Sequence, residues 1–209
     1  ILKFESKECF SIALNDICYR KDFIYYKHCI DVKKKLIKTL PQDKLIFKTH
    51  HFFGNIDGYD FTNQNNTLAF IFLVRDPREV ICSYSHYTAI PLDKQIEYVL
   101  LKDAVNYHKW ETKLNWSLTY KTWKAFKTVP SLFIKFEDLI KYPFETLSLT
   151  INFLSNISNI TYDENKIKNI IKLISFENLK RTEKEKGFFE SPKDRVFFRN
   201  GKIDSWKDI

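Results

Sequence analysis

Two polar side chains suited to handling a proton and an anion each come just after an apolar run. His50 follows LIFK (45–48), and Arg75 follows LAFIFLV (68–74). A neutral imidazole can take a proton from a hydroxyl group, and a guanidinium can donate two parallel hydrogen bonds to a phosphate. The sequence therefore predicts a site that combines a general base with an arginine that binds an anion.

Two more residues extend this candidate site. Lys48 lies two residues before His50, so on a strand both side chains point to the same face, and the lysine can stabilise negative charge that develops beside the base. The neighbouring His51 should face the other way. Ser83 stands three residues after Val80, at helical spacing, and we expect its side chain to face inward.

Each of these residues also has an ordinary structural interpretation. Buried serines commonly bond back to their own helix, so Ser83 alone does not indicate a ligand. Histidines at a strand end need no function, which leaves His50 open on spacing alone. Arg75 can equally form an ion pair with a nearby carboxylate. The acidic residues considered for that pair are Asp76, Glu79 and Glu137.

The elements that would position these side chains alternate between strands and helices. Three runs are nearly continuous in apolar residues, as in strands that are covered on both faces of a parallel sheet: 45–48, 68–74 and 131–136. Helical periodicity extends over 92–104, 110–126, 143–155 and 163–175. A further helix is predicted to begin at DPRE (76–79), with Asp76 as N-cap, Pro77 in the first position and Glu79 closing a capping box.

This alternation predicts an α/β fold of three layers, a central parallel sheet flanked by helices. Ligands bind at the carboxyl ends of parallel strands, so the polar residues that follow the first two strands are expected at one edge of the sheet.

Composition limits the class of protein further. The 209 residues, 44% of them hydrophobic, predict a single domain over 1–209. The net charge of +8 favours an anionic partner such as a nucleotide, nucleic acid or acidic lipid. The four cysteines have neither zinc-ligand spacing nor the pattern of a disulfide framework, and no apolar run reaches the roughly 18 residues of a membrane span. We expect a cytoplasmic protein with no metal and no integral membrane segment.

Five blocks along residues 45–207 resemble the cytosolic-type sulfotransferase family, whose members use 3′-phosphoadenosine 5′-phosphosulfate (PAPS). The blocks are KTHH (48–51), LVRDPREVICSYSHY (73–87), FIKFEDL (133–139), ISFENLK (174–180) and FFRNGKIDSWK (197–207). No single block is specific, but the ordered set is. The resemblance implies a P-loop NTPase-like α/β fold and a PAPS-dependent sulfotransferase whose product is 3′,5′-adenosine bisphosphate.

The resemblance also implies a role for each matching position. His50 matches the catalytic base that deprotonates a hydroxyl (or amine) acceptor, and Lys48 matches a lysine that helps bind the transferring group. Arg75 and Ser83 match the pair that holds the 3′-phosphate of the nucleotide. The other implied cofactor-binding residues are Phe136 near the adenine, Ser175 and Phe176 lining the nucleotide, and Arg199, Asn200 and Gly201 in a loop that closes over the same phosphate. That loop belongs to a covering segment, residues 187–209.

The sequence departs from the family pattern in three details. Asn200 replaces the lysine of the phosphate loop, although Lys202 could reach in. Phe136 lacks the phenol of the usual tyrosine, and Asp204-Ser205-Trp206 takes the place of Gly-Asp-Trp. These changes weaken the detail of the match more than the assignment to the family.

A larger departure concerns the strand-loop-helix that opens the family's domain and wraps the 5′-phosphosulfate. The first glycine here is Gly54, and no Pro-Lys-Ser-Gly-type loop precedes His50. The chain also begins at Ile1 and has no methionine. We therefore expect an N-terminally truncated fragment, which alone would transfer sulfuryl groups very slowly or not at all.

Two other classes of function stay open. The chain could be a non-catalytic nucleotide-binding relative of sulfotransferases, or a basic nucleic-acid-binding protein. The second is disfavoured because several aromatic residues stand at the helical spacings typical of packing: Trp110, Trp116, Tyr120 and Trp123. We expect no nucleic-acid partner and a small-molecule or glycan acceptor, shaped by residues 1–43 and 84–126. A phenol, a sugar and a lipid headgroup fit equally, and the oligomeric state stays open.

Overall fold

The computed structural model describes residues 31, 35, 46–56, 58–101, 106–108, 111–191 and 194–208. The chain divides into two compact units. The first comprises Ile1–Thr67 with Lys102–Thr128, and the second comprises Leu68–Leu101 with Val129–Ile209. Each unit is described by itself below, and the single domain over 1–209 stays a prediction. Nearly all of the expected acceptor segment 1–43 lies outside the described residues.

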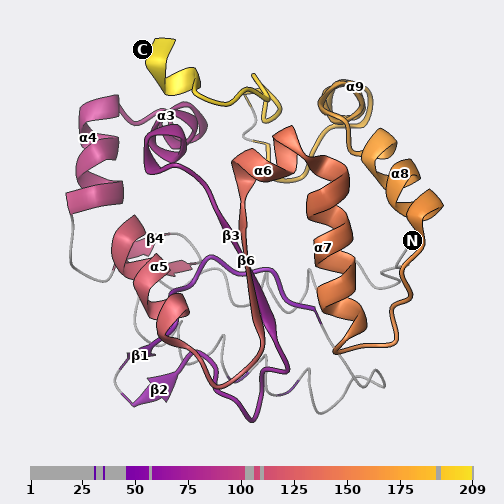
Figure 1. The fold of residues 1–209 in the computed structure, drawn as a ribbon. Helices are drawn as coiled ribbons and strands as arrows, with labels where there is room; N and C mark the ends of the chain where they lie inside the picture. The colour runs from indigo at the N-terminus through magenta and orange to yellow at the C-terminus, as the bar shows by residue number, and fades with distance from the viewer. Residues whose placement is uncertain are drawn as a thin grey trace. The chain divides into compact units, whose positions relative to one another are not determined.

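The second unit is built on a parallel pair of strands, β3 (Phe70–Val74) and β6 (Ser131–Lys135), paired in register from Phe70 opposite Ser131 to Val74 opposite Lys135. Its helical elements, most of them visible in Figure 1, are α3 (Pro77–Thr88), α4 (Leu92–Ile96), the π-helix η1 (Glu97–Leu101), α6 (Phe136–Lys141), α7 (Pro143–Ser155), α8 (Glu164–Leu173), α9 (Phe176–Lys186) and the 3₁₀-helix η2 (Ser205–Asp208). The predicted α/β class with a parallel sheet is confirmed.

One prediction about the strands is wrong. Residues 46–48 of the predicted strand 45–48 have no regular secondary structure, and Leu45 is not described. Ile71 and Leu73 on β3 are 39% and 54% exposed in the part of the chain that the structure describes. An apolar run can mark a strand without fixing which of its faces is covered, because that depends on distant segments.

Helix α3 begins at the predicted place for a partly different reason. Asp76 is the N-cap and its side chain accepts a hydrogen bond from the Arg78 backbone N–H at 2.9 Å, with Pro77 in the first position. The predicted capping box is wrong. The backbone N–H of Asp76 donates to Glu137 at 3.1 Å, while Glu79 turns away from it into the interior.

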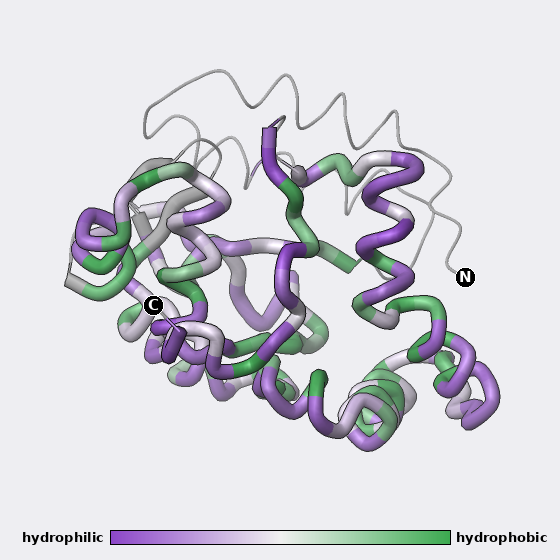
Figure 2. The backbone as a smooth tube through the Cα atoms, turned by 90° about the horizontal axis from the view of Figure 1, so that it is seen from above, coloured by the Kyte–Doolittle hydropathy of each residue, from purple (hydrophilic) through white to green (hydrophobic). Residues whose placement is uncertain are grey.

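The other helices follow their periodicity where a cap agrees with it. Helix α7 has the predicted bounds, and α8 begins after the N-cap Asp163. The predicted helix 92–104 is α-helical only to Ile96 and then widens into η1, and its residues 102–105 are not described. The tube in Figure 2 shows hydrophilic and hydrophobic residues alternating within helices, as amphipathic packing requires.

The described part of the first unit contains the short antiparallel pairs β1 (Asn55–Ile56) with β2 (Tyr59–Asp60) and β4 (Asn106–His108) with β5 (Glu111–Lys113), and α5 (Trp116–Ala125). Helix α5 begins later than the predicted 110–126 because the buried Asn115 caps it, accepting from the Leu118 N–H at 2.8 Å. Phe53 stacks on Phe126 with ring centroids 4.2 Å apart.

The core of the second unit includes Ile81 and Cys82 of α3, Ile134 of β6 and Ile167 of α8, each at most 9% exposed. Helix α3 is therefore fixed by a buried face. Among the described residues, no helix is both long enough and apolar enough to span a membrane.

Candidate functional site

Arg75 directly follows β3 and is held on two sides. Its Nη2 donates to Oε2 of Glu79 at 2.9 Å, and its guanidinium carbon lies 4.5 Å from the centroid of the Phe136 ring. The ion pair that was one of the structural interpretations of Arg75 is therefore present. The pair does not bury Arg75 completely. The Arg75 side chain is 27% exposed, whereas the Glu79 side chain is 2% exposed. A fixed, partly exposed guanidinium is suited to binding an anion.

Ser83 lies on α3, two turns beyond Arg75, and is exposed rather than facing inward as predicted. Its hydroxyl makes no hydrogen bond with any residue that the structure describes, so it does not bond back to its own helix. Two neighbours on the same helix behave differently. Ser85 donates to the Ile90 carbonyl at 2.6 Å and Thr88 donates to the Tyr84 carbonyl at 2.7 Å. The Ser83 hydroxyl is accessible to a ligand.

The segment 197–206, which we call the phosphate loop, packs closely on the start of α9. A Cβ placed on Gly201 would lie 2.4 Å from Cδ2 of Phe176, and Gly201 has φ of +58°. Both facts favour glycine at this position. Ser175 is the N-cap of α9 and accepts from the Asn178 N–H at 3.3 Å. The cofactor role predicted for Ser175 must therefore be compatible with capping.

Two carboxylates hold the two ends of the phosphate loop. Glu183 of α9 accepts hydrogen bonds from the backbone N–H groups of Phe197 at 2.7 Å and Phe198 at 2.9 Å. Glu79 of α3 accepts from the Ser205 hydroxyl at 2.9 Å and from the Trp206 N–H at 3.1 Å. Between these anchors, Arg199, Asn200, Gly201 and Lys202 are exposed.

Charged side chains act on the Cys82 thiol of α3. Burial raises the pKa of this thiol, the charge of Glu79 raises it further, and the positive charges of Arg199 and Arg75 oppose that rise. The charges of both arginines therefore act on the residue that precedes Ser83.

The predicted base and its lysine belong to the first unit. His50 and Lys48 are exposed, whereas His51 is 9% exposed and its ring lies 5.0 Å from that of Phe61. The His51 carbonyl accepts a hydrogen bond from Nε1 of Trp123 at 2.9 Å. The backbone at His51, the residue after His50, is therefore anchored to α5. His50 is exposed and His51 is buried, as expected if the two side chains face opposite ways.

The structure thus groups the sequence-predicted residues by unit. All the predicted nucleotide-binding residues lie in the second unit: Arg75, Ser83, Phe136, Ser175, Phe176, Arg199, Asn200 and Gly201. Sequence reasoning missed Glu183 entirely. For Glu79, the predicted capping box is wrong, and the ion pair with Arg75 that was left open is present. The spacing of four residues between Arg75 and Glu79 was the only available signal for their pair.

The family follows from a comparison with known proteins. The family model described as "Sulfotransferase domain" matches residues 2–209, almost the whole chain. The chain belongs to the sulfotransferase family. Among curated relatives, it is 29% identical over 156 residues to flavonol 3-sulfotransferase of Flaveria bidentis, covering 66% of this chain and 48% of that protein. It is 26% identical over 176 residues to cytosolic sulfotransferase 14 of Arabidopsis thaliana, covering 75% and 47%. The chain thus spans about half the length of these relatives.

Solved structures of low identity share the sulfotransferase fold. A mouse sulfotransferase complexed with PAP is similar with a TM-score of 0.51 and 23% identity, over 66% of this chain and 51% of that chain. A retinol dehydratase in a complex with retinol and PAP is similar with a TM-score of 0.59 and 20% identity, over 93% of this chain and 59% of that chain. These similarities extend the α/β assignment to the sulfotransferase fold.

Proposed function

We propose that this sulfotransferase chain takes part in transfer of a sulfuryl group from PAPS to a hydroxyl (or amine) acceptor. One observation carries the proposal. In the second unit, Arg75 precedes α3 with its side chain 27% exposed, and Ser83 on α3 and Arg199 of the phosphate loop are both exposed. The positive charge of Arg199 acts on Cys82, the residue before Ser83. Two guanidiniums and a hydroxyl form a donor set suited to a phosphate dianion.

The residues of the second unit fit a nucleotide with a 3′-phosphate. Arg75 and Ser83 would bind this phosphate from one side and Arg199 from the phosphate loop, with Gly201 letting the loop lie flat on Phe176. Phe136 offers a ring near the adenine, although its other face is in contact with Arg75. When bound, PAPS supplies the sulfuryl group and leaves as 3′,5′-adenosine bisphosphate.

The residues of the first unit fit the proton transfer. The exposed imidazole of His50 would accept the proton of the acceptor, and Lys48 would stabilise the negative charge that develops on the transferring group. The anchor from Trp123 to the His51 carbonyl limits the movement of this segment. Such restriction favours a base that must meet its substrate in one geometry.

The named relatives guide the proposed acceptor and compartment. One curated relative is a flavonol sulfotransferase and another is called cytosolic, so we propose a cytoplasmic protein with a small-molecule hydroxyl acceptor. A glycan acceptor remains the other choice within the same chemistry.

Calorimetric titration tests the nucleotide site. Wild type is titrated with 3′,5′-adenosine bisphosphate and with 5′-AMP, which lacks the 3′-phosphate, and so are the Arg75→Ala and Arg181→Ala variants. Arg181 is an exposed arginine of α9 whose recorded partner is Asn178, so it controls for loss of charge. Wild type should prefer the bisphosphate, and Arg75→Ala should weaken that ligand by about tenfold or more, the scale of one hydrogen bond to a charged group.

Arg181→Ala should bind both ligands as wild type does. Equal affinity of wild type for the two ligands would contradict the 3′-phosphate site, and so would an unchanged affinity of Arg75→Ala for the bisphosphate.

A further inference from the structure

The two carboxylates that hold the ends of the phosphate loop differ in their other contacts. Glu79 is 2% exposed and also pairs with Arg75, so it belongs to the anion site itself. Within the described part of the chain, Glu183 forms no hydrogen bond or ion pair with Arg75 or Ser83, and it bonds to backbone groups at the other end of the loop. Its function is therefore separable from direct binding of the ligand.

The contacts of Glu183 need both oxygens of an ionised carboxylate. Oε1 accepts from the Phe197 N–H at 2.7 Å and from the Ser191 hydroxyl, and Oε2 accepts from the Phe198 N–H at 2.9 Å. Burial acts to raise the pKa of Glu183, but these hydrogen bonds outweigh it and hold the pKa below its usual range. A glutamine has one acceptor oxygen, so its amide nitrogen would face one of the N–H donors.

A short turn connects the residues that Glu183 holds to Arg199. The backbone N–H of Arg199 donates to the Phe197 carbonyl at 3.0 Å. That carbonyl belongs to the same peptide group as the Phe198 N–H, which Glu183 holds, so this peptide also fixes the start of Arg199. Nearby, Nη1 of Arg195 donates to the Tyr87 carbonyl at 2.8 Å, which ties the preceding segment to the end of α3. The direction in which Arg199 leaves the backbone thus depends on Glu183.

We propose that Glu183 is a positioning residue for the 3′-phosphate, holding Phe197 and Phe198 so that Arg199 faces the anion site on α3. This inference rests on the proposed function, because it assigns Glu183 to the same nucleotide site. The loop has a second support. Phe188 packs on Phe197 and Phe198 with ring centroids 4.8 and 5.1 Å apart. Loss of the carboxylate should therefore loosen the loop without unfolding it.

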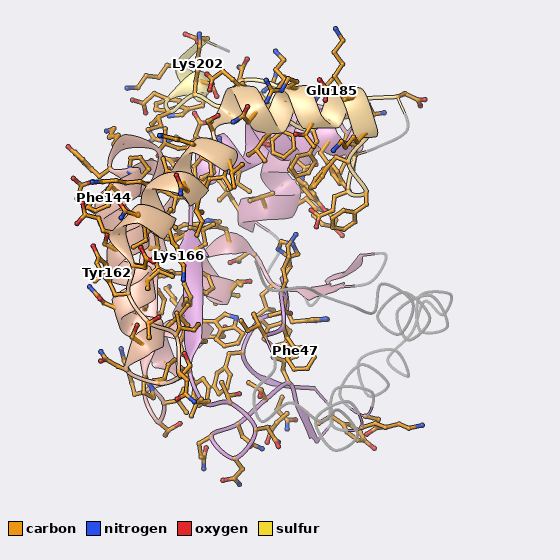
Figure 3. The ribbon with its side chains drawn as sticks, turned by 90° about the vertical axis from the view of Figure 1, so that its right-hand side faces the viewer. Phe47, Phe144, Tyr162, Lys166, Glu185 and Lys202 are labelled. Atoms are coloured by element: carbon orange, nitrogen blue, oxygen red, sulfur yellow. The ribbon has the colours of Figure 1, made fainter. Side chains whose placement is uncertain are left out.

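The test compares Glu183→Gln with Glu185→Gln. Glu185 is an exposed glutamate on the same helix, labelled in Figure 3, and makes no hydrogen bond or ion pair with any residue that the structure describes. Each protein is titrated with 3′,5′-adenosine bisphosphate and with 5′-AMP. Glu183→Gln should lose about tenfold in affinity for the bisphosphate and little for 5′-AMP, because only the first ligand carries the phosphate that Arg199 meets. Glu185→Gln should match wild type with both.

Thermal unfolding and circular dichroism check that each variant is folded. If Glu183→Gln does not fold, Glu183→Asp is tested instead. Its shorter side chain keeps both oxygens but shifts Phe197 and Phe198 from their positions. Its loss of preference for the bisphosphate should be smaller than tenfold but measurable against wild type. An unchanged preference in the folded variant, or equal loss of both ligands, overturns the positioning role while the proposed function stands. A wild type without preference for the bisphosphate overturns the proposed function and this inference together.

Discussion

At the scale of single residues, the phosphate loop depends on a position where no side chain fits. Gly201 combines φ of +58° with a Phe176 ring atom 2.4 Å from where its Cβ would lie. Gly187, at the end of α9, shares only the first condition, since it has φ of +72° and nothing within 4 Å of its Cβ position. The resemblance indicated Gly201 as a loop glycine, and the structure supplies the physical reason.

Alanine at these two glycines should separate backbone strain from steric overlap. Gly187→Ala should lower the free energy of unfolding by about 1–3 kcal/mol, because its backbone (φ +72°, ψ 170°) lies in a region nearly confined to glycine. Gly201→Ala should lower it by about 1–3 kcal/mol because Phe176 must move, and only this variant should weaken binding of 3′,5′-adenosine bisphosphate. Chemical denaturation and calorimetry measure the two effects. Equal affinity of the two variants for the bisphosphate would contradict the packing described here.

At the scale of elements, local signals decided which predictions succeeded. Asp76 and Asp163 cap α3 and α8 with their own side chains, and such caps can be read from neighbouring residues. The start of α5 was missed because Asn115, a weaker signal within a periodic stretch, caps it. The prediction of a strand at 45–48 was wrong because an apolar run forms a strand only beside a partner strand, and the local sequence does not identify that partner.

The hydrogen bond from α5 to the histidine segment gives a prediction at this scale. Trp123→Phe removes the donor at 2.9 Å from the His51 carbonyl and leaves that buried acceptor unsatisfied, which should lower the free energy of unfolding by about 1–3 kcal/mol. Trp116→Phe is the matched control on the same helix, where the ring stacks on Tyr120 and a phenyl ring can do the same. Denaturant unfolding of both variants decides, and an equal loss in the two would argue against a specific role of the Trp123 anchor.

At the scale of the whole molecule, ordered blocks of sequence were enough to predict the family, and the match over residues 2–209 confirms it. The contacts that build the anion site were not predictable in the same way. Glu79 meets Ser205 and Trp206 across separations of 126 and 127 residues, and Glu183 meets Phe197 and Phe198 across 14 and 15. The residues next to a helical carboxylate in the sequence do not indicate such distant partners.

The most direct test of the account is hydrogen–deuterium exchange of this chain alone, with 3′,5′-adenosine bisphosphate, and with 5′-AMP. Backbone amides of the Arg75–α3 region and of the phosphate loop 197–206 should exchange more slowly with the bisphosphate than with 5′-AMP, because in the proposed site Arg75, Ser83 and Arg199 bind the 3′-phosphate there. The same protection by both ligands, or protection by the bisphosphate only outside these two segments, would contradict the assignment of the nucleotide site.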